Sequence, residues 1–253
     1  MKTRFLLFVS IICLTISVNA TSLTISDTNK TDNSGKKTGI WKERLGQSDY
    51  YGNYVNDKKD GLWVGYHANG VISNMDEYKN GLKNGYSILI DKTGFLYQKE
   101  TYINDSLNGK SMAYFPGAKV KSETDYTMGV LNGLKKVYYS DGKLQEEGHY
   151  KGNLRDGSVK WFFAEGQLSV EYQYKKGKQE GVQKTYFKNG NINSEVTTVN
   201  NLEEGECHEY FENGKMKISG KYIHGKKEGP WKEFDENGKL IKTENYKNNE
   251  LKK

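Results

Sequence analysis

The hydrophobic and polar positions of this chain recur in one fixed pattern along most of its length. Counting back from Gly229 in steps of 24, glycine recurs without insertion at Gly205, Gly181, Gly157, Gly133, Gly109, Gly85 and Gly61. We call these eight residues the anchor glycines. Tyrosine stands seven residues before an anchor in seven of the eight units, and Tyr, Phe or Ile stands five residues after it. Self-similarity at a fixed period of this length is typical of a repeat architecture.

A second glycine divides each unit and marks a turn. It follows the anchor by nine residues, or by eight in the third unit, and in five units Asn or Asp precedes it: Asn69-Gly70, Asp141-Gly142, Asn189-Gly190, Asn213-Gly214 and Asn237-Gly238. Such pairs favour positive φ at both central residues, which is the geometry of a two-residue hairpin turn. The pattern therefore predicts a tight two-residue turn at each of these pairs.

A second turn is predicted four residues before each anchor. Every one of these positions holds Gly, Asn or Asp: Asp57, Gly81, Asp105, Gly129, Asn153, Gly177, Asn201 and Gly225. These residue types enter the left-handed region most cheaply. We expect one left-handed residue per turn, with an ordinary conformation at its neighbour, as at Lys176 before Gly177.

Two short strands per unit, joined by such turns, must run antiparallel. The sequence thus predicts an all-β fold, an elongated single-layer antiparallel β-meander built of about eight 24-residue β-hairpin repeats, with about sixteen strands or slightly more. Helix is not expected in the repeat region, because a glycine or turn pair interrupts each unit twice.

The N-terminal segment 1–20 has the pattern of a signal peptide. Lys2 and Arg4 give a positive start, an apolar stretch covers 5–16, and Val18-Asn19-Ala20 is a small-residue exit. We expect cleavage after Ala20. Two alternatives stay open, an uncleaved anchor and a lipoprotein at Cys13, although Ile12 is not the small residue that lipidation favours.

Polar residues fill 21–36, which we expect to be a disordered tether. The repeat domain is predicted to cover 37–253. Its first unit is irregular, because Gly39-Ile40-Trp41 repeats as Gly61-Leu62-Trp63 at a spacing of 22. An atypical first unit is expected of a repeat array, whose ends need caps.

Composition fits a thin sheet. Hydrophobic residues make up 35% of the chain and the mean hydropathy is −0.85, while 19 Tyr and 9 Phe supply apolar area. The net charge is +6, or +4 without Lys2 and Arg4, and basic and acidic residues are interleaved. A nucleic-acid site needs clustered Arg and Lys. Because only Arg4, Arg44 and Arg155 are present, we expect no nucleic-acid partner.

The best-formed unit carries the core Tyr-x-x-Gly-Lys-x-x-Gly-x-Trp, at Tyr222, Gly225, Lys226, Gly229 and Trp231, followed by the turn Asn237-Gly238-Lys239. This pattern resembles the MORN-repeat variant family, in the form common in bacterial secreted proteins, and the resemblance covers roughly 37–253. It implies β-hairpins stacked into an elongated, twisted sheet. Some relatives are labelled antitoxin components of toxin–antitoxin modules.

One position departs from the family pattern in most units. Trp63 and Trp231 occupy the tryptophan position, two residues after the anchor, whereas other residue types stand there in six units: Ser87, Ser111, Lys135, Val159, Gln183 and Cys207. Cys207 lies outside the predicted leader and has no cysteine partner there, so we expect a packed residue and not a reactive thiol. His208 beside it suggests metal, but His67, His149 and His224 fall at unrelated repeat positions.

Other groups with chemical potential have structural interpretations. Glu203, Glu204, Glu206, Glu209 and Glu212 form the densest acidic run, without the spacing of a calcium loop. Glu123, Glu147, Glu171 and Glu195 recur with the period of the anchor glycines and predict a ladder with Lys along the sheet. Trp161, Phe162 and Phe163 form the one aromatic cluster, for which packing is preferred over sugar binding. No catalytic motif is found, so we expect no catalytic residues, no metal and no cofactor.

These features favour a non-enzymatic exported repeat scaffold that mediates protein–protein or cell-envelope interaction, in the periplasm or outside the cell. The expected partner is a protein or a cell-envelope component, and no membrane span is expected after the leader. Two alternatives stay open. One is an envelope carbohydrate-binding accessory or hidden enzyme, and the other is an antitoxin- or immunity-like protein that neutralises a partner toxin. The sequence indicates neither the binding residues nor the oligomeric state.

Overall fold

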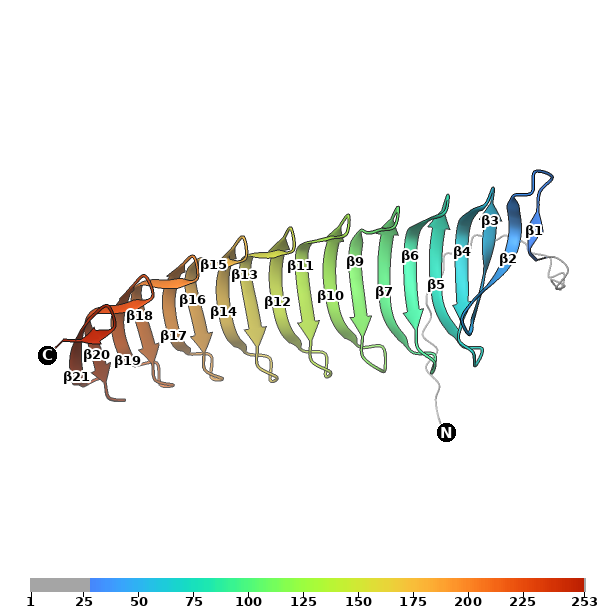
Figure 1. Ribbon diagram of the computed structural model, residues 1–253. Coiled ribbons are helices and arrows are strands. Elements are labelled where there is room, and N and C mark those ends of the chain that lie inside the picture. The colour runs from blue at the N-terminus through green and yellow to red at the C-terminus, as the bar shows by residue number, and fades with distance from the viewer. Residues whose placement is uncertain (1–27, 253) are drawn as a thin grey trace, which may run out of the picture.

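The computed structural model describes residues 28–252, which form one long antiparallel sheet (Figure 1). The predicted signal peptide, 1–20, and the start of the predicted tether lie outside the described residues. Among the residues described there is no helix, and hence none long and apolar enough to cross a membrane.

The sheet contains 22 strands. The first eleven are β1 (Lys30–Thr31), β2 (Lys37–Leu45), β3 (Ser48–Val55), β4 (Lys58–Tyr66), β5 (Ile72–Lys79), β6 (Leu82–Ile90), β7 (Leu96–Ile103), β8 (Ser106–Leu107), β9 (Gly109–Tyr114), β10 (Val120–Thr127) and β11 (Val130–Tyr138). The others are β12 (Leu144–Lys151), β13 (Leu154–Phe162), β14 (Leu168–Lys175), β15 (Lys178–Gln179), β16 (Gly181–Tyr186), β17 (Ile192–Val199), β18 (Leu202–Tyr210), β19 (Met216–Ile223), β20 (Lys226–Phe234), β21 (Leu240–Lys247) and β22 (Glu250–Leu251).

The predicted single-layer meander is confirmed. Strands that follow each other in the chain pair antiparallel, except that β8 and β9 both pair with β7, and β15 and β16 both pair with β14 (Figure 1). The strand count exceeds sixteen for two reasons. Additional strands stand at both ends of the described region, and two repeat strands are interrupted just before an anchor glycine, which separates β8 from β9 and β15 from β16.

Order begins earlier in the chain than predicted. Lys30 and Thr31, which fall in the predicted disordered tether, form β1 and pair with Thr38 and Lys37 of β2. The side-chain oxygen of Asn29 also accepts a hydrogen bond from the Lys42 backbone, at 2.7 Å. The edge of the sheet is therefore covered by residues outside the predicted repeat domain.

The two turn types are the reverse of those predicted. At the turn before each anchor both central residues have positive φ, as at Lys176 (+50°) and Gly177 (+80°). These are the two-residue type I′ turns. The prediction of one left-handed residue, with Lys176 in an ordinary conformation, is wrong. Short two-residue loops select the twist of type I′ even where one residue is not glycine.

The predicted two-residue turn at the Asn-Gly pairs is also wrong. Gly70 donates its backbone N–H to the His67 carbonyl at 2.9 Å, and φ is positive at Gly70 but not at Asn69. This is a three-residue loop, a type I turn followed by one left-handed residue. Asn suits the loop for another reason, because the Asn69 side chain donates to the Lys92 carbonyl of the next hairpin's turn at 2.9 Å.

The anchor glycines form bulges inside the strands. All eight have positive φ, from +69° at Gly229 to +127° at Gly133. The pairing register shifts beside them, for example between Tyr51 and Asn53 opposite Gly61. A bulge bends its strand and strengthens the local twist. Glycine is required at these positions because a bulky side chain is strained at positive φ.

Candidate functional site

Directly paired residues of neighbouring strands share one face of a sheet. The tryptophan positions and the residues opposite them therefore form one row, which we call the tryptophan face: Trp41, Gly52, Trp63, Asp76, Ser87, Glu100, Ser111, Thr124, Lys135, Gly148, Val159, Tyr172, Gln183, Val196, Cys207, Gly220, Trp231 and Glu244. Trp63, Val159, Cys207 and Trp231 are buried here. This row is the core of a molecule that is one sheet thick.

Size complementarity across the row explains where tryptophan occurs. A Cβ atom built on Gly52 would lie 2.2 Å from the Trp63 ring, and one on Gly220 would lie 2.3 Å from the Trp231 ring. Each of these two tryptophans thus stands opposite a glycine. The bulge also folds Lys59 over Trp63, with Nζ 3.9 Å from the ring centroid, a favourable cation–π distance.

In the second unit Ser87 replaces the tryptophan, and polar side chains there hydrogen-bond to one another. Buried Ser87 donates to a side-chain oxygen of buried Asp76, and Lys83 Nζ lies 2.8 Å from the same oxygen. The Asn74 side chain donates to the other oxygen at 2.7 Å. Both oxygens of this buried carboxylate accept hydrogen bonds from the protein. Asp76 is therefore a structural residue.

The opposite side of the sheet, which we call the ladder face, carries the predicted charge ladder. Paired residues alternate in sign along six consecutive pairings, and His208 pairs with the last glutamate: Glu123, Lys136, Glu147, Lys160, Glu171, Lys184, Glu195 and His208. Ion pairs join Lys136 to Glu147 at 3.1 Å and Lys184 to Glu195 at 3.5 Å. The ladder is confirmed, and it ties these carboxylates to the fold.

The structure places Cys207 and His208 on opposite faces. Burial raises the pKa of the Cys207 thiol to about 11, so the reactive thiolate is scarce at neutral pH. His208 Nδ1 lies 3.7 Å from Glu195 at the end of the ladder. His224 sits in a type I′ turn, 3.3 Å from Glu204. Residues 28–252 contain no group of three His, Cys, Asp or Glu side chains that could hold a metal ion.

The acidic run and the aromatic cluster are both divided by strand alternation. Trp161 packs edge-on against Tyr172, with ring centroids 5.8 Å apart, on the tryptophan side. Phe162 pairs with Leu168, and Phe163 begins the three-residue turn. In the acidic run, Glu204 accepts the His224 backbone N–H at 2.8 Å. Neither group converges on one site.

A cavity lies at the N-terminal end, where the repeat is irregular. The β2–β3 register runs without a shift from Gly39–Tyr54 to Leu45–Ser48, and it closes in a two-residue turn with positive φ at Gly46 but not at Gln47. The turn is one residue shorter than the others and the register shift is absent, which together account for the spacing of 22. The hairpin lacks the bulges of its neighbours, and a cavity of about 720 Å³ lies between it and the β4–β5 turn.

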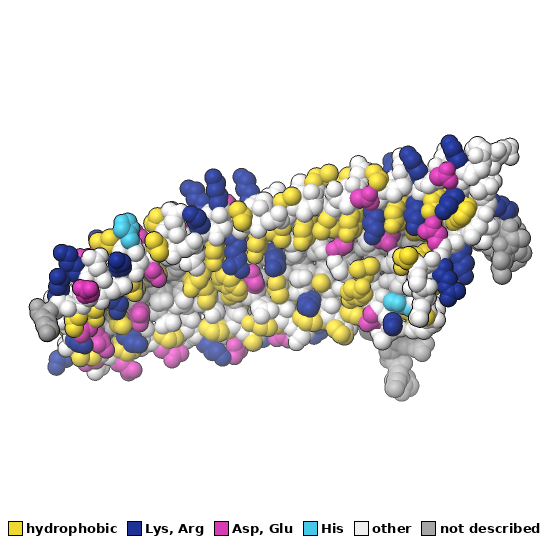
Figure 2. Space-filling model, viewed as in Figure 1, with side chains coloured by type: hydrophobic (Ala, Val, Ile, Leu, Met, Phe, Trp, Pro, Cys, Tyr) yellow, Lys and Arg dark blue, Asp and Glu magenta, His cyan; other side chains and the backbone are white. Residues whose placement is uncertain are grey.

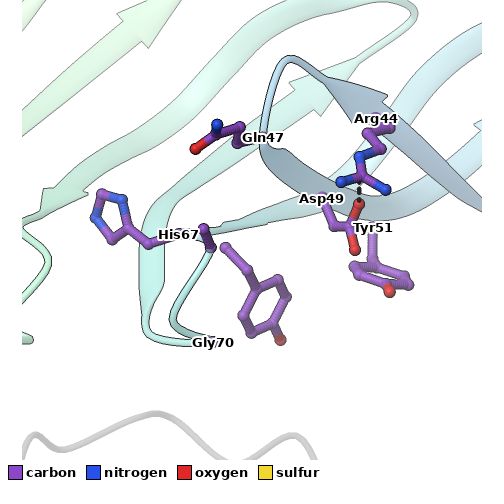
Figure 3. A pocket seen from close by; sticks show the side chains of 8 residues that line it. Arg44, Gln47, Asp49, Tyr51, His67 and Gly70 are labelled. Carbon is purple, nitrogen blue, oxygen red and sulfur yellow. Dashed lines mark ion pairs between the residues drawn. The ribbon is translucent and has the colours of Figure 1, made fainter.

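Figure 3 shows the walls of this cavity, which we call the N-terminal cleft. Arg44 and Gln47 come from the β2–β3 hairpin, and His67 and Gly70 come from the turn opposite. Asp49 pairs with Lys42 at 2.8 Å and lies 4.0 Å from Arg44 Nε. The Tyr51 and Tyr66 rings meet edge-on, with centroids 5.7 Å apart.

Sequence reasoning missed this cleft, although it identified the irregular first unit as a cap and named His67. The spacing of 22 was a signal that the first turn differs from the others. It could not indicate that a cavity lies between this hairpin and the β4–β5 turn. Elsewhere hydrophobic side chains lie in rows along the sheet, interleaved with Lys and Arg (Figure 2).

The family comparison agrees with the hairpins. The family model described as "MORN repeat variant" matches six segments, 59–80, 131–151, 155–176, 179–200, 203–224 and 227–248, together about half of the chain. Each segment begins two residues before an anchor glycine and contains one three-residue turn. No curated protein matches the chain significantly. With the same hairpin recurring in register along one sheet, this chain belongs to the MORN repeat variant family.

Proposed function

We propose that this protein is a non-enzymatic, exported scaffold that binds a protein or cell-envelope component along its sheet. One observation carries the proposal. The sheet is a single layer, so both faces and both rows of turns are accessible along its whole length in the described region. Membership in a repeat family supports a scaffold role, because stacked units create extended binding surfaces.

The side chains that could perform chemistry support the same proposal. Carboxylates of the ladder are paired with lysines, Cys207 is buried with a raised pKa, and the histidines stand apart. Nucleophilic catalysis needs a nucleophile, a base and an orienting group in contact. A protein that acts by binding spreads its contacts over several units, although a few aromatic anchors dominate the energy of many interfaces.

Export is proposed from the segment 1–20 alone, with the periplasm or the cell exterior as destination. Cell fractionation and the intact mass of the exported protein test it. We expect a chain that begins at Thr21. A chain that begins at Met1, or one lipidated at Cys13, would contradict the proposed cleavage.

Affinity capture of envelope proteins and glycans, combined with an alanine scan, tests the binding role. The scan replaces His67, His149, Asp156, Glu206, Cys207 and His208 one at a time, with thermal unfolding as a control for folding. Asp156 is included although its carboxylate accepts the Lys176 backbone N–H at 3.1 Å. We expect partial losses of capture or cellular phenotype, or none. Complete loss of the phenotype from one folded variant that still captures its partner would reveal an active site and overturn the proposal.

A further inference from the structure

In the N-terminal cleft, Tyr66 stands five residues after its anchor glycine and has different surroundings from its equivalents in the fourth and seventh units. In the fourth and seventh units the equivalent hydroxyls, of Tyr138 and Tyr210, donate to Glu123 at 3.0 Å and to Glu195 at 2.9 Å. In the first full unit Tyr51 stands at the position of that glutamate. Tyr66 therefore packs on a ring instead of bonding to a carboxylate, and within residues 28–252 its hydroxyl makes no hydrogen bond to the protein.

The cleft also contains a carboxylate with one unused oxygen. Asp49 Oδ2 is held by Lys42, but Asp49 Oδ1 is buried without a hydrogen-bond partner in the described region. Arg44 Nε lies 4.0 Å away, too far for a direct hydrogen bond. The Arg44 side chain is 72% exposed. With Arg44 turned outward, a ligand hydroxyl between the two groups would accept from Arg44 and donate to the otherwise covered Asp49 Oδ1.

The remaining wall adds acceptors and donors. The His67 ring points away from Arg44 and Asp49, because its Nε2 bonds to the Ile90 carbonyl of the next hairpin at 2.9 Å (Figure 3). The Gln47 amide supplies both a donor and an acceptor. The two tyrosine rings contribute apolar surface beside these polar groups.

From this combination we propose that the N-terminal cleft is a saccharide-binding subsite. A sugar presents hydroxyls that donate and accept at once, together with an apolar C–H surface that packs on aromatic rings. Arg44, Gln47 and Asp49 match the hydroxyls, and Tyr51 and Tyr66 match the apolar surface. The volume of about 720 Å³ lies within the range of about 300–1,000 Å³ typical of small-molecule sites.

Other ligand classes fit the cleft less well. An anion would have to compete with the Asp49 carboxylate for the two nearby cations, Lys42 and Arg44. A purely apolar ligand would leave Asp49 Oδ1 unpaired, which costs free energy in a buried position. The inference goes beyond the proposed scaffold role and does not depend on it, because a saccharide subsite needs no protein partner.

Binding of the full chain to an array of soluble oligosaccharides, containing neutral hexoses, N-acetylated amino sugars and acidic sugars, tests the proposal. We expect at least one array member to bind, with affinity at least about tenfold weaker in Tyr66→Ala and in Asp49→Ala. Tyr66→Phe removes the hydroxyl alone and should give a smaller loss. Tyr186→Ala is the matched control, because it removes the same repeat position outside the cleft and should leave affinity unchanged.

Unfolding midpoints establish that each variant is folded, and Arg44→Ala and Gln47→Ala provide cleft variants at exposed positions that do not endanger the fold. The proposal is overturned if no array member binds the unaltered chain. It is equally overturned if Tyr66→Ala and Tyr186→Ala weaken binding alike, or if inorganic phosphate displaces the bound sugar, which would identify an anion site.

Discussion

Backbone conformation at single residues decides the geometry of the type I′ turns, and Lys176 offers a test. Its φ of +50° costs an L-residue other than glycine on the order of 1 kcal/mol. Lys176→Gly should therefore increase the free energy of unfolding by up to about 1 kcal/mol, which raises the urea midpoint. Lys175→Gly is the control. It lies in β14 with ordinary φ and should lose about 0.5–1 kcal/mol. A midpoint for Lys176→Gly below that of the unaltered chain would contradict the turn assignment.

The sequence located the type I′ turn before every anchor glycine but misassigned its type. Gly, Asn or Asp four residues before each anchor marks the correct place, whereas His224 and Met128 also have positive φ and carry no such compositional signal. Loop length imposed their conformation. At Asn69-Gly70 the opposite error arose, because the dipeptide suits both turn types and the bond from Asn69 to the next turn is invisible in one unit of sequence.

Cys207 should resist alkylation in the folded chain. Burial raises its pKa to about 11 from an ordinary value of 9.0, which lowers the thiolate fraction near pH 8 about a hundredfold. Labelling by iodoacetamide, measured on a Cys13→Ser chain, should be at least that much slower in buffer than in denaturant. Equal labelling rates in the two conditions would show that the thiol is exposed.

At the scale of paired strands, glycine and tryptophan act as one unit. Gly220→Ala places a Cβ that clashes with the Trp231 ring. The free energy of unfolding should fall by about 1–3 kcal/mol, or by more if the ring cannot shift. Gly148→Ala is the matched control, because the Val159 methyls stand at 3.2 and 3.3 Å and give more easily. The double variant Gly220→Ala with Trp231→Val should cost less than the sum of its parts. Additive losses in urea unfolding would show that the pair is independent.

The tryptophan position shows why one unit of sequence was not enough. Ser, Lys, Val, Gln and Cys at this position looked like loss of a family residue. Each in fact faces a particular neighbour on the preceding strand, such as Asp76 opposite Ser87 or Gly148 opposite Val159. Complementarity across a strand pair follows from the register, and the register depends on the bulges. The anchor glycines were found from the sequence, but their bulged conformation was not.

Along the whole molecule, stability should depend on contacts between adjacent units. The Gly177 backbone donates to the Arg155 carbonyl of the preceding unit at 2.8 Å, and this bond recurs along the row of type I′ turns. Deleting 150–173 places Tyr174 where Tyr150 stood and preserves each strand pairing, so a folded, shorter chain is expected. Deleting 150–161 joins His149 to Phe162 and removes a turn. Equal thermal unfolding of the two deletion chains would refute a modular stack.

The candidate site followed from the sequence far less than the fold did. Periodicity identifies what repeats, and the N-terminal cleft exists because its unit does not repeat. Tyr51 stands at the position that glutamate holds in four units, and the first hairpin lacks a bulge. The change of residue type can be seen in the sequence, as can the short spacing. The cavity depends on how the β2–β3 hairpin and the β4–β5 turn are arranged in space, which the sequence pattern does not indicate.

Tyrosines distributed along the sheet should make the molecule unfold in alkali. Burial, reinforced by the Asp76 carboxylate, raises the pKa of Tyr78 to about 12. Burial and the hydrogen bond to Glu195 raise the pKa of Tyr210 to about 12. Both groups titrate near 10 in an unfolded chain, so the folded state holds these protons more tightly. Their stabilising contribution is fully present below pH 10 and is lost as pH rises through 12.

Urea midpoints measured from pH 8 to pH 12 check this expectation, which predicts a decline that begins near pH 10. Tyr210→Phe removes one titrating hydroxyl from the ladder face while keeping the ring, so its midpoint should fall less steeply over the same range. His208 and Lys184 stay beside Glu195 in that variant, which keeps the rest of the ladder comparable. A midpoint that is flat to pH 12, or an identical slope in Tyr210→Phe, would mean that the tyrosine hydroxyls are no less acidic in the folded sheet than in the unfolded chain.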